Sequence, residues 1–248
     1  MKLTLALWQR ASMQWSGDEF LQALDEAMAQ TEADVFITPE LCWPGYGDAR
    51  SSRDDAVGQA SSLITSVRAI VLGYAEADGA RLFNSAMCID AHGAIVANYR
   101  KQTTANDYER LCFGKGSHGP IFLLNGVPTS VLICLDVEFP ELVRRASLDG
   151  AHLLIVPTAL APRWRVVPEM VIPTRAYENG IFVAYCNYAT GSDAGPFCGL
   201  SLVAGPDGRT IANAQFGDCI LEATIESGQV AEARSHLDYL RHLELLRY

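Results

Sequence analysis

The 248-residue sequence has no apolar run that approaches the roughly 20 residues a membrane-spanning helix requires, so we expect no transmembrane segment. It also lacks the basic, apolar and small-residue regions of a signal peptide at its start, and we therefore expect no secretory leader. Positive charge is scarce, because 19 Lys and Arg residues face 29 Asp and Glu residues and the net charge is −10. Nucleic acids and anionic membranes bind clustered positive charge, so we expect neither as a partner.

Closely spaced metal ligands and cysteine pairs are missing as well. The seven cysteines are odd in number and scattered without a C-x-x-C pair: Cys42, Cys88, Cys112, Cys134, Cys186, Cys198 and Cys219. A disulfide framework requires an even, dense set, and a zinc site requires close Cys and His pairs that the five histidines do not supply. We therefore expect a reduced, cytoplasmic protein without a metal site, in which most cysteines are small buried apolar residues.

The composition and the apolar runs are typical of one folded domain. Hydrophobic residues make up 49% of the chain and charged residues 19%, and no linker interrupts it, so we expect a single domain over residues 1–248. We predict strands over residues 3–8, 35–37, 70–72, 83–89, 95–99, 131–133, 153–156, 181–185, 200–204, 210–212 and 220–223. We predict helices after a capping box at Ser16 and Glu19, and over residues 59–68, 141–148 and 170–179. This alternation indicates an α/β fold in which helices cover sheets.

Three of the predicted strands end at a chemically reactive side chain. Glu40 follows residues 35–37, Lys101 follows the strand that ends near residue 99, and Cys134 directly follows residues 131–133. The carboxyl ends of strands border the ligand crevice in open α/β sheets, so we expect these side chains to converge. The turn from strand to helix at Cys134 also offers backbone N–H groups that can bind an oxyanion.

Each of these residues also has an ordinary structural interpretation. Buried cysteines are usually inert packing residues, Glu40 could bond a loop backbone, and Lys101 could be a surface lysine. Taken singly, each residue favours the structural interpretation, and residue chemistry alone leaves the Glu–Lys–Cys site as a hypothesis. His152 offers no papain-like alternative, because it begins a predicted strand and suits packing or exposure better than pairing with Cys134.

Three motifs in chain order strengthen the catalytic interpretation: Thr38–Glu40, Tyr99–Lys101 and Cys134–Glu141. They resemble the signature motifs of the nitrilase superfamily of carbon–nitrogen hydrolases, and the similarity covers nearly the whole sequence. Supporting matches are Asn84–Ser85, Arg175–Asn179, Asn187, Gly199–Ser201 and Pro206–Gly208. The resemblance implies a four-layer αββα sandwich, a Glu–Lys–Cys triad without cofactors, and homodimers or higher homo-oligomers assembled through the sandwich faces and the C-terminal tail.

Carried over by position, the resemblance implies that Cys134 is the nucleophile, Glu40 the general base and Lys101 the charge stabiliser. The backbone N–H of Leu135 would help Lys101 to bind the oxyanion. These residue types suit amide hydrolysis, because a thiolate attacks an amide carbon more readily than a hydroxyl does. A neighbouring carboxylate can take the thiol proton and return it to the departing ammonia.

A second glutamate of the family often lies four residues before a Phe that precedes a Gly-containing turn. Glu109 stands four residues before Phe113, so the resemblance implies that it positions the substrate and polarises Lys101; otherwise it is a surface acid in a loop. Two positions depart from the common pattern. Leu135 replaces a Tyr, which leaves the backbone N–H in place, and Thr103 replaces a His, which makes this segment divergent.

We interpret the chain as an amidase that hydrolyses a small linear carboxamide to a carboxylic acid and ammonia. The tail motifs and the Glu-Phe-Pro-Glu sequence at residues 138–141 are most similar to amidases of amino-acid or ω-amino amides, such as the delta-aminovaleramidases. N-carbamoyl hydrolysis, which also releases carbon dioxide, is the runner-up, and nitrile hydrolysis is third. A catalytically silent binding subunit is less favoured, because such a subunit would be expected to lose a member of the triad.

Glu138, four residues after Cys134, is our candidate for substrate selection. Many superfamily members that act on carboxylate-bearing substrates carry an Arg at this position. A Glu would repel a carboxylate and could hold an ammonium group through a charge-assisted hydrogen bond, so we expect a preference for amides with a distant amine. The alternative is that Glu138 only complements the positive N-terminus of the following helix.

Overall fold

The computed structural model describes residues 1–13, 17–43, 68–191, 196–236 and 239–243, whose strands form two six-stranded mixed sheets. The first sheet contains, in spatial order, β12 (Cys219–Glu226), β1 (Lys2–Gln9), β2 (Val35–Ile37), β3 (Ala69–Asp78), β4 (Arg81–Ile89) and β5 (Ile95–Arg100). The second contains β11 (Thr210–Asn213), β10 (Leu202–Ala204), β9 (Phe182–Cys186), β8 (Leu153–Pro157), β7 (Val127–Val131) and β6 (Phe122–Leu124). Parallel pairing joins β1 to β2 to β3 in one sheet and β7 to β8 to β9 in the other.

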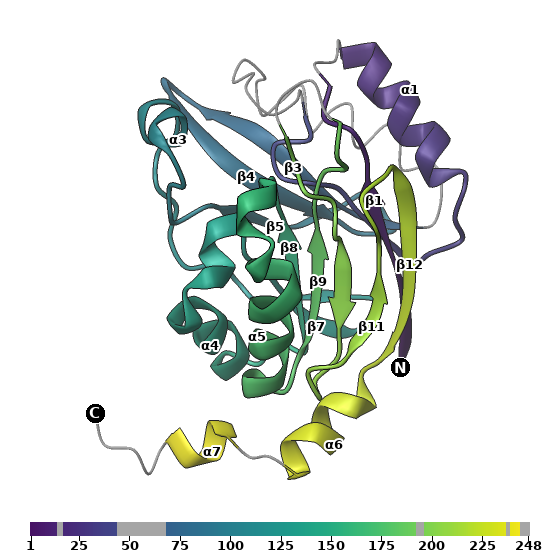
Figure 1. Cartoon of the computed structure of the whole chain (residues 1–248), viewed down its shortest axis with the longest axis vertical. Coiled ribbons are helices and arrows are strands. Elements are labelled where there is room, and N and C mark those ends of the chain that lie inside the picture. Colours follow the sequence, from purple (N-terminus) through teal and green to yellow (C-terminus); the bar gives the residue numbers. More distant parts are fainter. Residues whose placement is uncertain (14–16, 44–67, 192–195, 237–238, 244–248) are drawn as a thin grey trace.

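The helices lie outside the two sheets. They are α1 (Gly17–Met28), α3 (Asp107–Cys112), α4 (Pro140–Leu148), α5 (Ile172–Asn179), α6 (Gly228–His236) and α7 (Tyr239–Leu243), with the shorter η1 (Cys134–Glu138), η2 (Pro162–Trp164) and η3 (Val167–Val171). Figure 1 shows α1 on one side of the molecule and α4 and α5 on the other, with α6 and α7 leading away towards the C-terminus. The layers therefore follow the predicted αββα order. Within the described ranges, no helix has the length and apolarity needed to cross a bilayer.

The alternation of side chains along β1 explains the layering. Leu3, Leu5 and Leu7 are buried in the core cluster that both sheets share, whereas Ala6 and Trp8 belong to the cluster that contains the apolar stripe of α1. Successive side chains of a strand point to opposite faces, so each sheet buries one face on the other sheet and one under helices. This arrangement brings the loops that follow β2, β5 and β7 together.

Most predicted elements are confirmed, with differences at their ends. The strand predicted over residues 131–133 ends at Val131, and the next two residues lead into η1. The helix predicted over residues 170–179 instead begins as the π-helix η3 and continues as α5. Pro173 lies at this junction and has no N–H to donate, which favours a local change in the helical hydrogen-bond pattern. The capping residue Ser16 and most of the helix predicted over residues 59–68 lie outside the described residues.

Candidate active site

Glu40 follows β2 and is tied to both sheets. The chain here passes so close to β3 that a Cβ on Gly73 would lie 2.2 Å from the Pro39 carbonyl oxygen, so glycine is required. The Glu40 N–H donates to the carbonyl of Thr158 at 3.3 Å, and the Tyr188 hydroxyl donates to the Glu40 carbonyl at 2.9 Å. Thr158 and Tyr188 follow β8 and β9, so contacts from the second sheet hold a residue of the first.

Lys101 follows β5, and its ammonium group joins two carboxylates. Lys101 Nζ donates to Glu40 Oε1 at 2.6 Å and to the two Glu109 oxygens at 3.0 and 2.9 Å. Asn84 on β4 donates to the same Glu40 oxygen at 2.7 Å, and its carbonyl accepts the Lys101 N–H at 2.8 Å. Exposure is 3% for Lys101 and 1% for each glutamate, so one cation and two acidic groups lie together away from water.

Glu109 is positioned by α3, a six-residue helix that the sequence did not predict. The Asn106 side chain caps this helix by accepting the Glu109 N–H at 2.9 Å. The Ala105 N–H donates to Glu109 Oε2 at 2.8 Å, so backbone and lysine hold the carboxylate together. The structure thus places Glu109 against Lys101 and not at the surface.

Cys134 begins η1 in a strained backbone conformation. Its φ is +48°, a left-handed value that costs a non-glycine residue about 1–3 kcal/mol. The next residue, Leu135, lies in the first turn of η1, where N–H groups have no acceptor within the helix. Both residues line a cavity of about 220 Å³, whose walls also include Glu109, Glu138 and Trp164.

The surrounding charges set the protonation of these groups. Burial raises the pKa of the Cys134 thiol, Glu40 raises it further, and Lys101 opposes both. Burial also raises the pKa of the Glu40 carboxyl, against the attraction of Lys101. Burial would lower the pKa of Lys101, but the negative groups around it outweigh that effect and the pKa is raised. These shifts favour a neutral thiol beside a protonated lysine.

Glu138 ends η1 and lines the same cavity, whereas the alternative interpretation needs it at the N-terminus of the following helix. That helix, α4, begins only at Pro140. Its partly buried carboxyl has a raised pKa because of burial, which Arg175 and Lys101 oppose. Among the described residues, no hydrogen bond or ion pair reaches the Glu138 carboxylate. Its backbone carbonyl, however, accepts from Arg175 at 2.7 Å.

Sequence reasoning missed the polar side chains that support the reactive ones. Asn84 and Arg175 stood in matching motifs but received no role, although Asn84 bonds Glu40 and Arg175 holds the Val137 and Glu138 carbonyls. Tyr188 had no sequence signal.

In the described part of the chain, no group of three His, Cys, Asp or Glu side chains could hold a metal ion.

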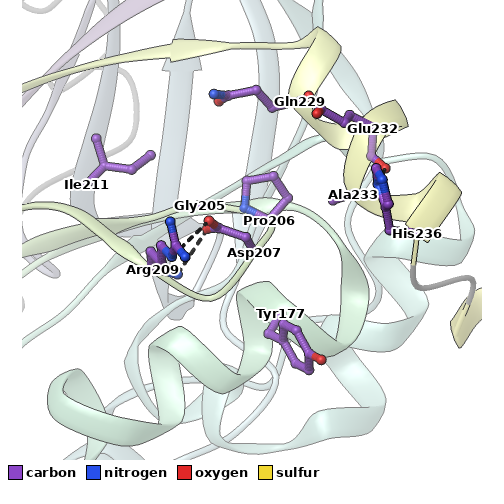
Figure 2. Close-up of a pocket in the computed structure, with 10 residues that line it drawn as sticks. All are labelled: Tyr177, Gly205, Pro206, Asp207, Arg209, Ile211, Gln229, Glu232, Ala233 and His236. Atoms are coloured by element: carbon purple, nitrogen blue, oxygen red, sulfur yellow. Dashed lines mark hydrogen bonds and ion pairs between the residues drawn. The ribbon is translucent and has the colours of Figure 1, made fainter.

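A larger cavity of about 510 Å³ lies elsewhere, between α5, the β10–β11 turn and α6. Figure 2 shows Tyr177, Asp207, Arg209 and His236 around it. None of the predicted site residues lines this cavity, and its walls hold no nucleophile with an adjacent base. We therefore place the chemistry at the smaller cavity.

Comparison with known proteins supports the same conclusion. Residues 4–235 match the carbon–nitrogen hydrolase family. The chain is 35% identical to a protein described as a hydrolase in the pqqF 5′ region of Pseudomonas protegens, over 89% of this chain and 81% of that protein. It is 30% identical to the 2-oxoglutaramate amidase of Bacillus subtilis over 83% of each chain, and 30% identical to an (R)-stereoselective amidase of Pseudomonas sp over 87% and 81%.

Solved structures of an amidase from Nesterenkonia sp. AN1 share the fold. A mutant in complex with butyramide has a TM-score of 0.86 and 30% identity, and the match covers 95% of both chains. A second mutant, which shows covalent addition of the acetamide moiety of fluoroacetamide at the active-site cysteine, matches with the same score, identity and coverage. The similarity to this amidase, in fold and in sequence, therefore extends over almost the entire chain.

Proposed function

The chain belongs to the carbon–nitrogen hydrolase family and hydrolyses amides, and we propose that its substrate is a small linear carboxamide attacked by Cys134. The hydrolysis proceeds through a covalent intermediate on a cysteine. One observation carries the assignment to these residues: Lys101 Nζ bridges Glu40 and Glu109, and Glu109 and Cys134 line one cavity. Glu40, Lys101, Cys134 and Glu109 are the proposed catalytic residues.

In the first half-reaction, Cys134 Sγ bonds to the amide carbon while Glu40 takes the thiol proton. Glu40 Oε1 is occupied by Lys101 and Asn84, whereas Oε2 has no hydrogen-bond partner among the described residues, so an acceptor is free. The Lys101 ammonium and the Leu135 N–H stabilise the oxyanion. When the carbon–nitrogen bond breaks, the proton on Glu40 moves to the nitrogen, ammonia leaves and a thioester remains.

In the second half-reaction, water attacks the thioester carbon and Glu40 takes a proton from that water. The carbon–sulfur bond then breaks, the sulfur recovers its proton and the carboxylic acid leaves. Glu109 holds Lys101 through two hydrogen bonds and also lines the cavity, which suits it to orient both the lysine and the substrate amide. As written, the two half-reactions use only side chains, one backbone N–H group and water.

We propose further that the substrate carries an amine distant from the amide, as in a delta-aminovaleramidase. Glu138 supports this proposal, because it lines the cavity and the nearby Arg175 forms its ion pair with Glu178 instead. An ammonium group placed there would gain a charge-assisted hydrogen bond of about 1.5–3 kcal/mol. The raised pKa of Glu138 reflects burial that such a partner would offset.

N-carbamoyl amino-acid hydrolysis is the second candidate, because Arg163 lines the same cavity. Its guanidinium lies 5.4 Å from the centre of the Trp164 ring and has no ion pair among the described residues. A guanidinium at this wall suits the carboxylate of a carbamoyl amino acid. Nitrile hydrolysis uses the same residues and ranks third.

Ammonia release separates these candidates. The panel contains an ω-amino amide, a neutral amide of equal length, a dicarboxylate monoamide, an N-carbamoyl amino acid and a nitrile. We expect the amino amide to have the highest kcat/KM, and Glu138→Gln to lower that value about tenfold or more without changing the neutral amide. Arg163→Gln is the matched control, because it removes the opposite charge from the same cavity and should affect only anionic substrates.

Two results would reject the amine preference: a dicarboxylate monoamide as the best wild-type substrate, or equal loss on amino and neutral amides in Glu138→Gln. Activity that is greatest on the carbamoyl amino acid and is lost in Arg163→Gln would establish the second candidate. A folded protein that releases no ammonia from any compound would favour the silent binding subunit.

We propose also that the chain acts in the cytoplasm as a homodimer or higher homo-oligomer. The larger cavity supports a second copy as the covering surface, because it lies beside α5 and α6 and is lined by the partly exposed Tyr177 (Figure 2). Tyr239 on α7 is also partly exposed. These two tyrosine rings contact each other with centroids 5.8 Å apart, so α7 already reaches the α5 surface. Subcellular fractionation with an antibody against the chain tests the location.

A further inference from the structure

We propose that Asp136 is a positioning residue that fixes Lys101 relative to Cys134, an inference that rests on the catalytic roles proposed above. Asp136 is fully buried, with 0% exposure, and it does not line the substrate cavity. Its carboxylate accepts hydrogen bonds from Ile133, Tyr99 and Thr103. It therefore connects the turn that carries the nucleophile with the segment that carries the lysine.

On the nucleophile side, Asp136 and Ile133 form two reciprocal hydrogen bonds, and Cys134 lies between them in the chain. The Ile133 N–H donates to Asp136 Oδ2 at 3.2 Å, and the Asp136 N–H donates to the Ile133 carbonyl at 3.0 Å. Cys134 lies between these two residues with its strained φ of +48°. Strained conformations persist only where surrounding contacts hold them, and these bonds supply such contacts.

On the lysine side, the same carboxylate binds residues on both flanks of Lys101. The Tyr99 hydroxyl donates to Asp136 Oδ2 at 2.7 Å, and Thr103 donates to Oδ1 from its N–H at 2.9 Å and from its hydroxyl at 2.8 Å. Gln102 donates to the Tyr99 oxygen at 3.0 Å, which directs the tyrosine proton towards Asp136. Thr103, which replaces the His of many family members, therefore serves as a hydrogen-bond donor to Asp136.

This connection matters because the reactive groups come from different sheets. Lys101 follows β5 of the first sheet, whereas Cys134 follows β7 of the second. Thr158 and Tyr188 tie the Glu40 segment to the second sheet, and Asp136 does the same for the Lys101 segment. A misplacement of about 1 Å in a catalytic group can lower the rate about 100-fold, so loss of this connection should lower kcat.

The test uses Tyr99→Phe and Thr103→Val, each of which removes one hydroxyl donor and leaves Asp136 in place. We expect each to lower kcat about tenfold with KM within about twofold, and Asp136→Asn to lower kcat about 100-fold. Thr103→Ser should restore kcat, because it returns the hydroxyl. The rate at which iodoacetamide alkylates Cys134 provides the same comparison without a substrate, and we expect it to change in the same variants.

Matched controls separate positioning from a general loss of stability. Ser147→Ala removes a buried hydroxyl bonded to the Asn179 carbonyl, and Thr129→Val removes a buried hydroxyl bonded to the Val127 carbonyl, both without contact to Asp136. They should lower the melting temperature about as much as the test variants and leave kcat unchanged.

Two outcomes would overturn the proposal: wild-type kcat and alkylation in Tyr99→Phe and Thr103→Val, or equal kcat losses in the controls. A dead Cys134→Ala enzyme combined with unaffected Tyr99→Phe and Thr103→Val variants would reject the positioning role and leave the proposed function standing. Iodoacetamide labelling that misses Cys134 in the active wild type would instead reject the catalytic assignment itself.

Discussion

At the scale of single residues, the thiol of Cys134, the proposed nucleophile, lies in surroundings that raise its pKa and so favour its protonated form. Burial and Glu40 raise its pKa more strongly than Lys101 lowers it. The thiol therefore requires a base during the reaction, in contrast to cysteine enzymes that store a thiolate beside a histidinium. The free oxygen of Glu40 fits this requirement.

The first prediction concerns Cys134 as the nucleophile and Glu40 as its base. Cys134→Ala should abolish turnover with the fold retained, because no other described side chain of the cavity offers a sulfur nucleophile. Glu40→Gln should lower kcat about 10²- to 10⁴-fold, and the double variant should be no worse than the worse single one, since the two act as a unit. Steady-state kinetics and intact mass after iodoacetamide treatment measure these effects. Turnover by Cys134→Ala, or an adduct on another cysteine, would contradict the assignment.

The second prediction concerns pH. The pKa of Glu40 is raised by burial, so protonation removes the base at a higher pH than for an ordinary glutamate of about 4.3. The logarithm of kcat/KM should therefore fall with falling pH, with a midpoint above that ordinary value. A rate profile over the acid range measures the midpoint. The Glu138→Gln variant serves as control and should keep the midpoint, whereas a midpoint at or below the ordinary value would contradict the role of burial.

At the scale of elements, the β3–β4–β5 meander has its own buried carboxylate, Glu76. It accepts hydrogen bonds from Ser85, Asn98 and Arg100, at 2.7, 2.9 and 2.6 Å respectively. Burial alone would raise the pKa of Glu76, but these partners lower it below the ordinary value. Because Arg100 precedes Lys101, this cluster also fixes the end of β5 from which Lys101, the proposed charge stabiliser, extends.

The third prediction follows from that cluster. Glu76→Gln should lower the free energy of unfolding by about 1.5–3 kcal/mol at neutral pH, the usual contribution of a hydrogen bond to a charged group. The depressed pKa means that this stabilisation is present above the unfolded-state value of about 4.3 and is lost as the pH falls towards the folded-state value. Urea denaturation of both proteins at neutral and acid pH measures the difference, which should narrow at acid pH. A difference that stays constant with pH would contradict the charge-based explanation.

At the scale of the whole molecule, the exposed surface near the C-terminus suggests an assembly. In Figure 1, α6 and α7 extend away from the two sheets towards the C-terminus. Tyr177 on α5 lines the larger cavity and is 37% exposed, and Tyr239 on α7, whose ring contacts Tyr177, is 40% exposed. Aromatic residues of this kind are enriched at protein interfaces.

The fourth prediction is that this surface holds two copies together. Light scattering after gel filtration should give at least twice the 27.0 kDa chain mass for the wild type and a lower mass for Tyr177→Glu. Leu123→Glu is the matched control, because Leu123 is 61% exposed on β6 and should not change the mass. A monomeric wild type would reject the proposed assembly.

We also propose that residues 1–248 form a single domain. The core cluster shared by both sheets includes residues from Leu3 to Val230, so local unfolding of either half would expose apolar surface. Thermal unfolding of the wild type, followed by circular dichroism and by intrinsic fluorescence, should therefore show one coincident transition. Two separated transitions would contradict the single domain.

The sequence by itself predicted an α/β fold, because the alternation of strands and helices depends on local patterns, whereas the four-layer sandwich and the roles of Glu40, Lys101 and Cys134 came from the family resemblance. Periods of apolar residues predicted β1, β2, β4, β5 and α4 closely, and the ends of β2 and β5 placed Glu40 and Lys101. Strand ends border the ligand crevice in open α/β sheets, so the order of strands and reactive residues made convergence with Cys134 a hypothesis, which the family resemblance then strengthened.

Only the tertiary structure decided how these groups are held. Glu109 lies on a helix too short to show a period, and Asp136 and Asn84 bond partners more than 30 positions away in the chain. Such hydrogen bonds leave no local signature, because they depend on how two sheets pack and not on the neighbouring residues. The exact end of a strand was equally hidden, because strand preference depends on the surrounding packing: β7 ends at Val131, and η1 then runs from Cys134 to Glu138.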